Sequence, residues 1–320
     1  MRPRRERGMV LLLVLLVVVL LTTLLTEFAF STLVDLRLAE TFRDSTRAYY
    51  LAKGGINAGT VLLKRDLNRH DSLDELWSQG IIDYPVGDGR VSIRIEDLRG
   101  KLAINSLVVD NNPQTVMVDR FYRLFSALEL PPPANPAELT AALIDWLDGD
   151  DVTHRTIRDG EREIPTAGAE DAYYLGLAPA YRCKNGPLHT LDELVNIKGF
   201  SPEVLRRVTP FLAVNGDAKI NINTAPIEVL MALSPAIDPD VARSIVDYRT
   251  ATPIDRLDQL EGILPTVAFV DLKTQGNLDR LGTTGNLYRI EAQARINDGQ
   301  RRVVAEVDKT TGQVLFLKVD

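Results

Sequence analysis

The stretch "RRERGMVLLLVLLVVVLLTTLLTEFAF", Arg4–Phe30, decides the fold of this chain. A basic head meets a long apolar run across a single glycine, Gly8. As a helix rising about 1.5 Å per residue, the run Met9–Leu25 covers roughly 26 Å, enough for a hydrocarbon core of about 30 Å with small adjustments at its ends. The arginines before Gly8 should stay on the cytoplasmic side, which sends the rest of the chain outward. We therefore expect a membrane-inserted helix over residues 9–30.

This run differs from a secretory signal peptide, whose apolar core has about 7–15 residues and precedes a small-residue cleavage site. No convincing site follows here, and apolar residues continue at near-helical spacing among charges as far as Leu62. We predict one long helix that ends near Asp66, with its first half in the membrane and its second half amphipathic. The alternative is an ordinary single-pass anchor on an exported domain.

The exported part is predicted to be an α+β fold. Alternating apolar residues predict a half-buried strand at Arg90–Asp97, and Lys101–Asn105 reads as a second short strand after the turn-rich link Asp83–Gly89. Near the C-terminus, "NLYRIEAQARI", "RRVVAEV" and "VLFLKV" predict further strands, and Asp298-Gly299 is a hairpin signal. A small antiparallel sheet is therefore split in sequence, with two strands before and three after a helical insert.

The insert, residues 113–284, has helical spacing at Val116–Leu128 and Leu139–Leu147, and later helices should begin near Thr190, Pro202, Pro226, Pro239 and Asp255. Two pairs of segments echo each other: "KLAIN" with "KININ", and "HTLDELVNIKGF" with "DRLDQLEGILP". The echo favours two related helical units, about Asn111–Asn215 and Lys219–Thr284. Chance repetition of helix-start patterns remains the alternative.

An acidic segment, "LIDWLDGDDVTHRTIRDGEREIPTAGAEDAYY" at Leu143–Tyr174, crowds carboxylates where a helix should end. Carboxylates at a helix C-terminus oppose the helix dipole, so their clustering favours a counter-cation. Calcium takes about six to eight oxygen ligands and tolerates irregular loops, and no Cys/His pattern suggests zinc. The spacing is not that of an EF-hand. A solvated acidic loop is the alternative to a calcium site.

Charge and composition weigh against nucleic acid and against catalysis. The formal net charge is −7, and the first eight residues hold four arginines and one glutamate, so the rest carries −10. The stretch from Lys219 is similar to helix-hairpin-helix modules of DNA-uptake and repair proteins, but its hairpin "SPAIDPDVA" has two prolines and sets Asp238 and Asp240 where a phosphate would sit. The lone cysteine, Cys183, and the scattered histidines form no nucleophile motif. We expect a helix-hairpin-helix or SAM-like insert, no nucleic acid and no enzyme activity.

The N-terminal stretch "RG-MVLLLVLLVVVLL" resembles the class III signal of type IV pilins and pseudopilins. The resemblance implies that a prepilin peptidase cuts after Gly8 and methylates Met9, so that the apolar run survives as the assembly helix. Most pilins carry a glutamate five residues after the glycine, where this sequence has Leu13. A carboxylate in hydrocarbon is costly and needs a partner, implied in pilins to be the N-terminal amine of the adjoining subunit. Within type II secretion the missing glutamate resembles the K class of minor pseudopilins, which implies a subunit at the tip of the pseudopilus.

K-class pseudopilins also carry a stretch similar to Asp145–Asp151 and Gly168–Tyr174, and the resemblance implies calcium there. The expected ligands are Glu170, Asp171, Asp150, Asp148 and Asp151.

The resemblance implies a protein that initiates or caps the pseudopilus for export across the outer membrane. Its implied partners are the I and J classes of minor pseudopilins, the pseudopilus and the prepilin peptidase. It implies a single-pass protein of the inner membrane with its C-terminal domain in the periplasm. A membrane-anchored periplasmic scaffold, or a helix-hairpin-helix binding domain like those of DNA uptake, is the competing function. The predicted organisation is a leader (1–8), a transmembrane segment (9–30), the rest of the helix with the first strands (31–112), the insert (113–284) with its acidic loop (145–174), and the final strands (285–320).

Overall fold

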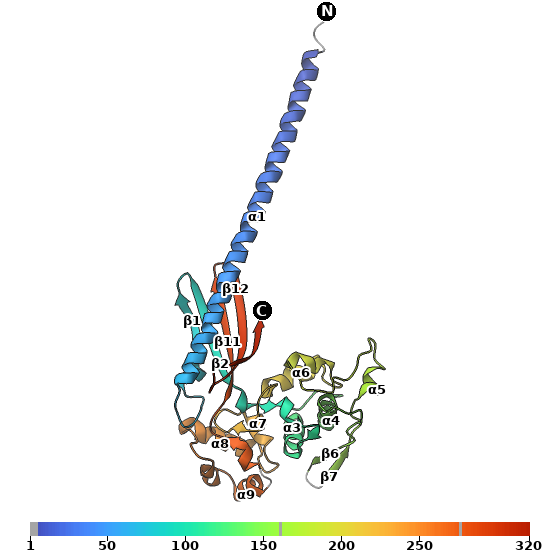
Figure 1. Cartoon of the computed structure of the whole chain (residues 1–320), viewed down its shortest axis with the longest axis vertical. Helices are drawn as coiled ribbons and strands as arrows, with labels where there is room; N and C mark the ends of the chain where they lie inside the picture. Colours follow the sequence, from blue (N-terminus) through green and yellow to red (C-terminus); the bar gives the residue numbers. More distant parts are fainter. Residues whose placement is uncertain (1–5, 160–161, 275–276) are drawn as a thin grey trace, which may run out of the picture.

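The computed structural model describes residues 6–159, 162–274 and 277–320. Helix α1 runs without a break from Glu6 to Arg65, and its N-terminal half projects from the folded body (Figure 1). The apolar side chains between Met9 and Phe42 are exposed. Within the described chain, the part of this helix from Gly8 to Arg65 is long and apolar enough to cross a membrane. The predicted long helix is confirmed.

The C-terminal half of α1 packs on an antiparallel sheet of strand order β1-β2-β11-β12-β13. The strands are β1 (Ile81–Val86), β2 (Gly89–Asp97), β11 (Leu287–Ile296), β12 (Gly299–Asp308) and β13 (Val314–Val319). The sheet is split around the insert as predicted, because β2 pairs directly with β11 along its whole length. Alternate residues of β2 and β11 face α1, and they form a core with Ala52, Ile56 and Leu63.

The first strand of this sheet was predicted wrongly. Residues 81–86 form β1, whereas the sequence predicts a turn-rich link from Asp83 onward. Asp83 has φ +51°, and Pro85 lies two residues further on. Both features are typical of a turn, which explains why the sequence pattern does not indicate a strand here. The predicted strand Lys101–Asn105 is not in the sheet: its core, β3 (Leu102–Ala103), pairs in parallel with β8 (Leu212–Ala213) inside the insert. Both β3 side chains are buried, so the segment has no solvent face.

The predicted hairpin joins β11 to β12, but Gly299 is needed for packing against α1 rather than for the turn itself. The turn lies between Ile296 and Gly299, with Asn297 at φ +49°. Gly299 is the first residue of β12, and a Cβ there would lie 2.4 Å from the carbonyl carbon of Asp44 in α1. The glycine therefore allows the helix backbone to touch the hairpin.

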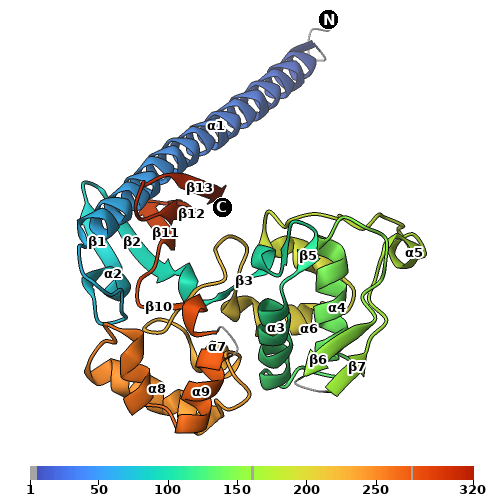
Figure 2. The ribbon, with the colours of Figure 1, turned by 60° about the horizontal axis from the view of Figure 1, so that its bottom comes forward.

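The insert is mainly helical and has its own core (Figure 2). Its α-helices are α3 (Thr115–Ala127), α4 (Pro136–Leu147), α5 (Asp171–Tyr174), α6 (Pro202–Val208), α7 (Ile227–Met231), α8 (Pro239–Ala251) and α9 (Thr266–Thr274), and α2 (Leu76–Gln79) precedes the sheet. The 3-10 helices are Leu98–Gly100, Ile104–Ser106, Leu191–Asn196, Thr209–Phe211, Leu257–Gly262 and Leu278–Arg280. The remaining strands are β4 (Val108–Val109), β5 (Asn112–Pro113), β6 (Thr156–Asp159), β7 (Arg162–Pro165), β9 (Ile220–Asn221) and β10 (Leu281–Gly282).

The helices predicted near Thr190 and Asp255 are 3-10 helices rather than α-helices. Both begin with the same contact, in which the side chain of the third helical residue accepts from the backbone N–H of the residue before the helix: Thr190 N to Glu193 at 3.0 Å, and Arg256 N to Gln259 at 2.9 Å. The two echoing segments thus share one local geometry.

Candidate functional site

Helix α4 carries the acidic segment into the interior of the insert. It begins at Asn135, whose side chain accepts a hydrogen bond from Ala137 N at 2.9 Å, with Pro136 in the first turn. Nearly all its residues are buried, including Asp145 and Trp146. The helix ends where Asp148 N donates to Ile144 O at 3.0 Å.

Asp145 ties the following loop to α4. Its Oδ1 accepts from His154 N at 2.8 Å and its Oδ2 accepts from Ala169 N at 2.6 Å. Gly168 has φ +49°, and a Cβ there would lie 2.1 Å from Asp145 Oδ2, so only glycine fits. Burial raises the pKa of Asp145 to about 6, against the two backbone hydrogen bonds. Because both its oxygens are already bonded, Asp145 acts as a positioning residue.

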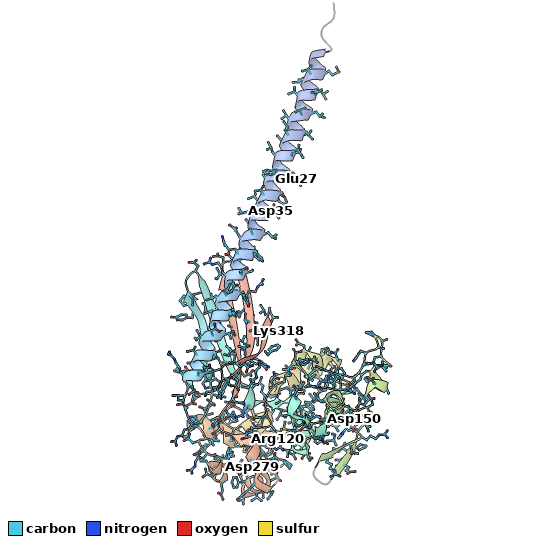
Figure 3. All side chains as sticks on the ribbon, in the orientation of Figure 1. Glu27, Asp35, Arg120, Asp150, Asp279 and Lys318 are labelled. Carbon is cyan, nitrogen blue, oxygen red and sulfur yellow. The ribbon has the colours of Figure 1, made fainter. Side chains whose placement is uncertain are left out.

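The loop brings together three of the five predicted ligands. Asp148, Asp150 and Glu170 each offer one carboxylate oxygen, and these oxygens all lie within 4.8 Å of one another. Figure 3 shows Asp150 on the insert, far from α1. Glu170 is only 3% exposed and Asp148 6%. Within the described residues, both Glu170 oxygens and Asp148 Oδ1 are buried without a hydrogen-bond partner.

The electrostatics of this cluster favour a cation. Burial, followed by the neighbouring carboxylates Asp145 and Asp148, raises the pKa of Glu170 to about 8. Burial, and then Asp150, raises the pKa of Asp148 to about 7. A buried carboxylate without a partner is costly, and hard cations prefer oxygen ligands of this kind. The orphaned oxygens therefore fit a calcium ion.

The other two predicted ligands lie outside the cluster. Asp171 accepts from Cys183 N at 2.8 Å and pairs with Arg182 Nη1 at 3.3 Å. Asp151 is exposed and does not belong to the grouped oxygens.

Asn185 is a residue that the sequence analysis missed. Its Nδ2 donates to Asp150 O at 2.9 Å, and its Oδ1 is buried with no partner among the described residues. An amide oxygen is a suitable calcium ligand. The only sequence signal was the turn dipeptide Asn185-Gly186.

The residues between the two acidic motifs form the hairpin β6–β7, which packs on α3 and α4 through Ile157. Residues 160–161 at its tip lie outside the described residues.

A second acidic group, Asp66, Asp71 and Glu75, has a different character. Lys309 Nζ lies 2.8 Å from Asp66 Oδ2 and also bonds Asp71 Oδ1. The ammonium group already supplies the positive charge, so this cluster joins α1 to the end of the sheet rather than forming a metal site.

The start of α8 differs from that of a phosphate-binding helix-hairpin-helix module. Asp238 Oδ1 accepts from Asp240 N at 3.0 Å and from Val241 N at 2.8 Å. The N–H groups that would bind a phosphate are thus already bonded to a carboxylate.

At the N-terminus, Gly8, Met9 and Leu13 lie on the exposed part of α1. A Cβ at Gly8 would have no neighbour within 4 Å, so packing does not require this glycine.

Comparison with known proteins places these features in a family. Family models described as type II secretion system (T2SS), protein K match residues 100–217 and 220–283. A type II secretion system protein K of Pectobacterium carotovorum subsp. carotovorum is 30% identical over 279 residues, covering 82% of this chain and 81% of that protein. The chain belongs to the type II secretion system protein K family. Family membership confirms the predicted resemblance to K-class minor pseudopilins and the role in type II secretion.

A further relative and a solved structure are similar to this chain. The protein K of Pseudomonas aeruginosa is 35% identical over 213 residues, which is 63% of this chain and 60% of that protein. A chain in the crystal structure of the GspK-GspI-GspJ complex from enterotoxigenic Escherichia coli has the same fold, with a TM-score of 0.71 and 19% identity. That match covers 89% of this chain and 99% of the other.

Proposed function

We propose that this chain is the tip subunit of the type II secretion pseudopilus, where it initiates or caps assembly for export across the outer membrane. The exposed apolar half of α1, with Leu13 in place of a carboxylate, is the observation that carries this proposal. Leu13 is 62% exposed, and an apolar helix surface of this kind needs lipid or the apolar helices of other subunits.

The N-terminal residues of α1 indicate on which side of this subunit the other subunits lie. After cleavage at Gly8, the amine of Met9 could pair with a carboxylate of the subunit below. Leu13 cannot make the equivalent bond to a subunit above, and a charge in hydrocarbon persists only with a partner. The insert lies at the end of the molecule opposite the N-terminus (Figure 1), where its bulk would hinder further addition.

We propose I- and J-class minor pseudopilins as partners, by analogy with the GspK-GspI-GspJ complex. The prepilin peptidase would process the chain in the inner membrane, with the sheet and insert in the periplasm. The role is assembly rather than catalysis.

Processing provides the test. Mass spectrometry of the mature protein should find N-methylated Met9, and Gly8→Ala should remain unprocessed and fail to support secretion. Leu13→Glu should still be processed, but it should weaken function because its carboxylate has no amine partner at the tip. Normal processing of Gly8→Ala would favour the competing function, a periplasmic scaffold on an ordinary anchor.

We also propose that the acidic cluster holds calcium through Asp148, Asp150 and Glu170, with Asn185 as a further candidate ligand. Bound calcium would neutralise the crowded carboxylates and link the end of α4 to the start of α5. The orphaned buried oxygens support this proposal over a solvated acidic loop.

A further inference from the structure

The two edges of the pilin-like sheet differ in how they are protected. At one edge, β1 contains Pro85, a left-handed Asp83 and a shift of register between Ile81 and Tyr84. Proline removes a backbone donor, and an irregular register prevents a neighbouring strand from pairing evenly. The β1 edge is therefore closed to further strands.

The opposite edge, β13, is open. It contains no proline, and β12 is its single neighbour in the described sheet. Its one shift of register lies near its start, where Val314 pairs with Val307, and the register is regular from Phe316 to Val319. Arg302 N donates to Asp320 O at 3.1 Å, and Asp320 N donates to Arg302 O at 2.9 Å. In an antiparallel pair such doubly bonded residues alternate with residues whose N–H and C=O point away. Leu317 and Val319 therefore turn their backbone groups outward from the sheet edge.

The side chains of β13 are also apolar at alternate positions, as in a strand that pairs on both sides. Leu315, Leu317 and Val319 alternate along β13 and are 51%, 47% and 45% exposed. They point to the face of the sheet that carries α1, because Leu317 and Val319 lie opposite the buried residues Ala305 and Val303. An apolar strand with free backbone groups is the usual template for addition of another strand.

Lys318, the one basic residue of β13, does not place its charge along the open edge. Lys318 lies opposite Val304 on the other face, and its Nζ pairs with Asp192 Oδ2 of the insert at 3.0 Å. Figure 3 shows Lys318 on the side of the sheet that faces the insert, and Figure 2 shows β13 as the last strand beside the C-terminus.

We infer that the β13 edge binds an extended strand of a neighbouring pilin-fold subunit, which continues the sheet. The outward backbone groups select a strand rather than a helix, and the row Leu315, Leu317 and Val319 selects apolar residues at alternate positions. The inference rests on the proposed function, because packing of the exposed half of α1 against other subunits would bring their globular parts beside this sheet.

Hydrogen exchange of the full chain, alone and co-purified with its I- and J-class minor pseudopilins in detergent, tests this inference. The amides of Leu317 and Val319 should exchange rapidly in the free chain and slow by about 100-fold or more in the complex, as expected for newly bonded strand amides. The amide of Lys318, directed toward β12, should be protected in both. A complex that forms while Leu317 and Val319 exchange at unchanged rates overturns the inference.

The failure of the proposed function would look different, because no complex would then form with the wild-type chain. Protection of the same amides in the absence of other pseudopilins would assign the edge to a second copy of this chain, and would also overturn the inference.

Substitutions give an independent readout. Leu317→Pro removes the outward N–H while leaving the β12-directed groups in place, and it should reduce the co-purified subunits by about 10-fold, equivalent to about 1.4 kcal/mol. Ile82→Ala alters the closed edge and should bind within about 3-fold of the wild type. Leu317→Ala keeps the N–H but shortens one apolar side chain of the row, so its loss should be smaller than that of Leu317→Pro. Undiminished binding by Leu317→Pro overturns the inference. If that variant loses protection at Lys318, showing that β13 has detached, the exchange of the wild-type complex decides.

Discussion

Replacing Glu170 with glutamine should abolish a stabilising response to calcium. Two unit charges 4.8 Å apart repel by about 3.5 kcal/mol at an effective dielectric constant of about 20. Full ionisation of Asp148, Asp150 and Glu170 creates such a repulsion in each pair, about 10 kcal/mol in total without a counter-ion. This approaches the whole stability of an ordinary domain, about 5–15 kcal/mol. The cluster must therefore bind either protons or a cation.

The pH dependence follows from the raised pKa. Glu170 titrates at about 8 in the folded protein and at 4.5 when unperturbed. The metal-free folded state binds the extra proton, so the stability that Glu170 contributes is fully present below pH 4.5 and is lost as the pH rises through 8. The response to calcium should grow over the same interval, because the cation then replaces the proton.

Thermal unfolding of the full chain at pH 8, in calcium or in chelator, measures the effect. Calcium at about 100 times its Kd should add about 2.7 kcal/mol to the wild type. This corresponds to a rise in Tm of about 5–11 °C for a unit of this size. Glu170→Gln should shift by less than about 2 °C, since it removes two of the three charge pairs.

Asp171→Asn is the matched control, because it neutralises the adjacent carboxylate outside the cluster and should keep the full response. An equal calcium shift in wild type and Glu170→Gln, or no shift in the wild type, would refute the reasoning.

Three further predictions concern the frame around the site. Gly299→Ala should lower the free energy of unfolding by about 1–3 kcal/mol, because its Cβ would meet the backbone of α1. Gly54→Ala, on the open side of α1, should be neutral or stabilising, and urea unfolding of the two variants compares them. Burial raises the pKa of Asp97 to about 6 from 3.8, so the wild type should lose stability as the pH rises from about 4 to 6, and Asp97→Asn should flatten that slope in urea titrations across this range. Lys309→Met should destabilise the protein by about 3–5 kcal/mol, because it leaves the buried Asp71 without its ammonium partner. Adding Asp71→Asn should recover part of this loss in the same unfolding assay. If the effects of the two substitutions on the free energy of unfolding simply add, Lys309 and Asp71 are not coupled.

The sequence by itself determined the long helix, the split sheet and the place of the acidic loop. Each follows from a periodic or local pattern: the unbroken apolar run after Gly8, the alternation at Arg90–Asp97 and the crowded carboxylates after α4. Such patterns record which face of an element avoids water, and that preference needs no knowledge of distant residues.

Only the tertiary structure decided which carboxylates meet. Asp171 and Glu170 are adjacent in sequence, yet Asp171 bonds Cys183 N while Glu170 is buried beside Asp148. Asn185 reaches the same loop through Asp150 O, from a segment with no acidic signal. The same holds for Gly299, whose need for glycine comes from Asp44 on a distant helix. Contacts between segments far apart in the chain depend on how the elements pack, and packing leaves no local pattern in the sequence.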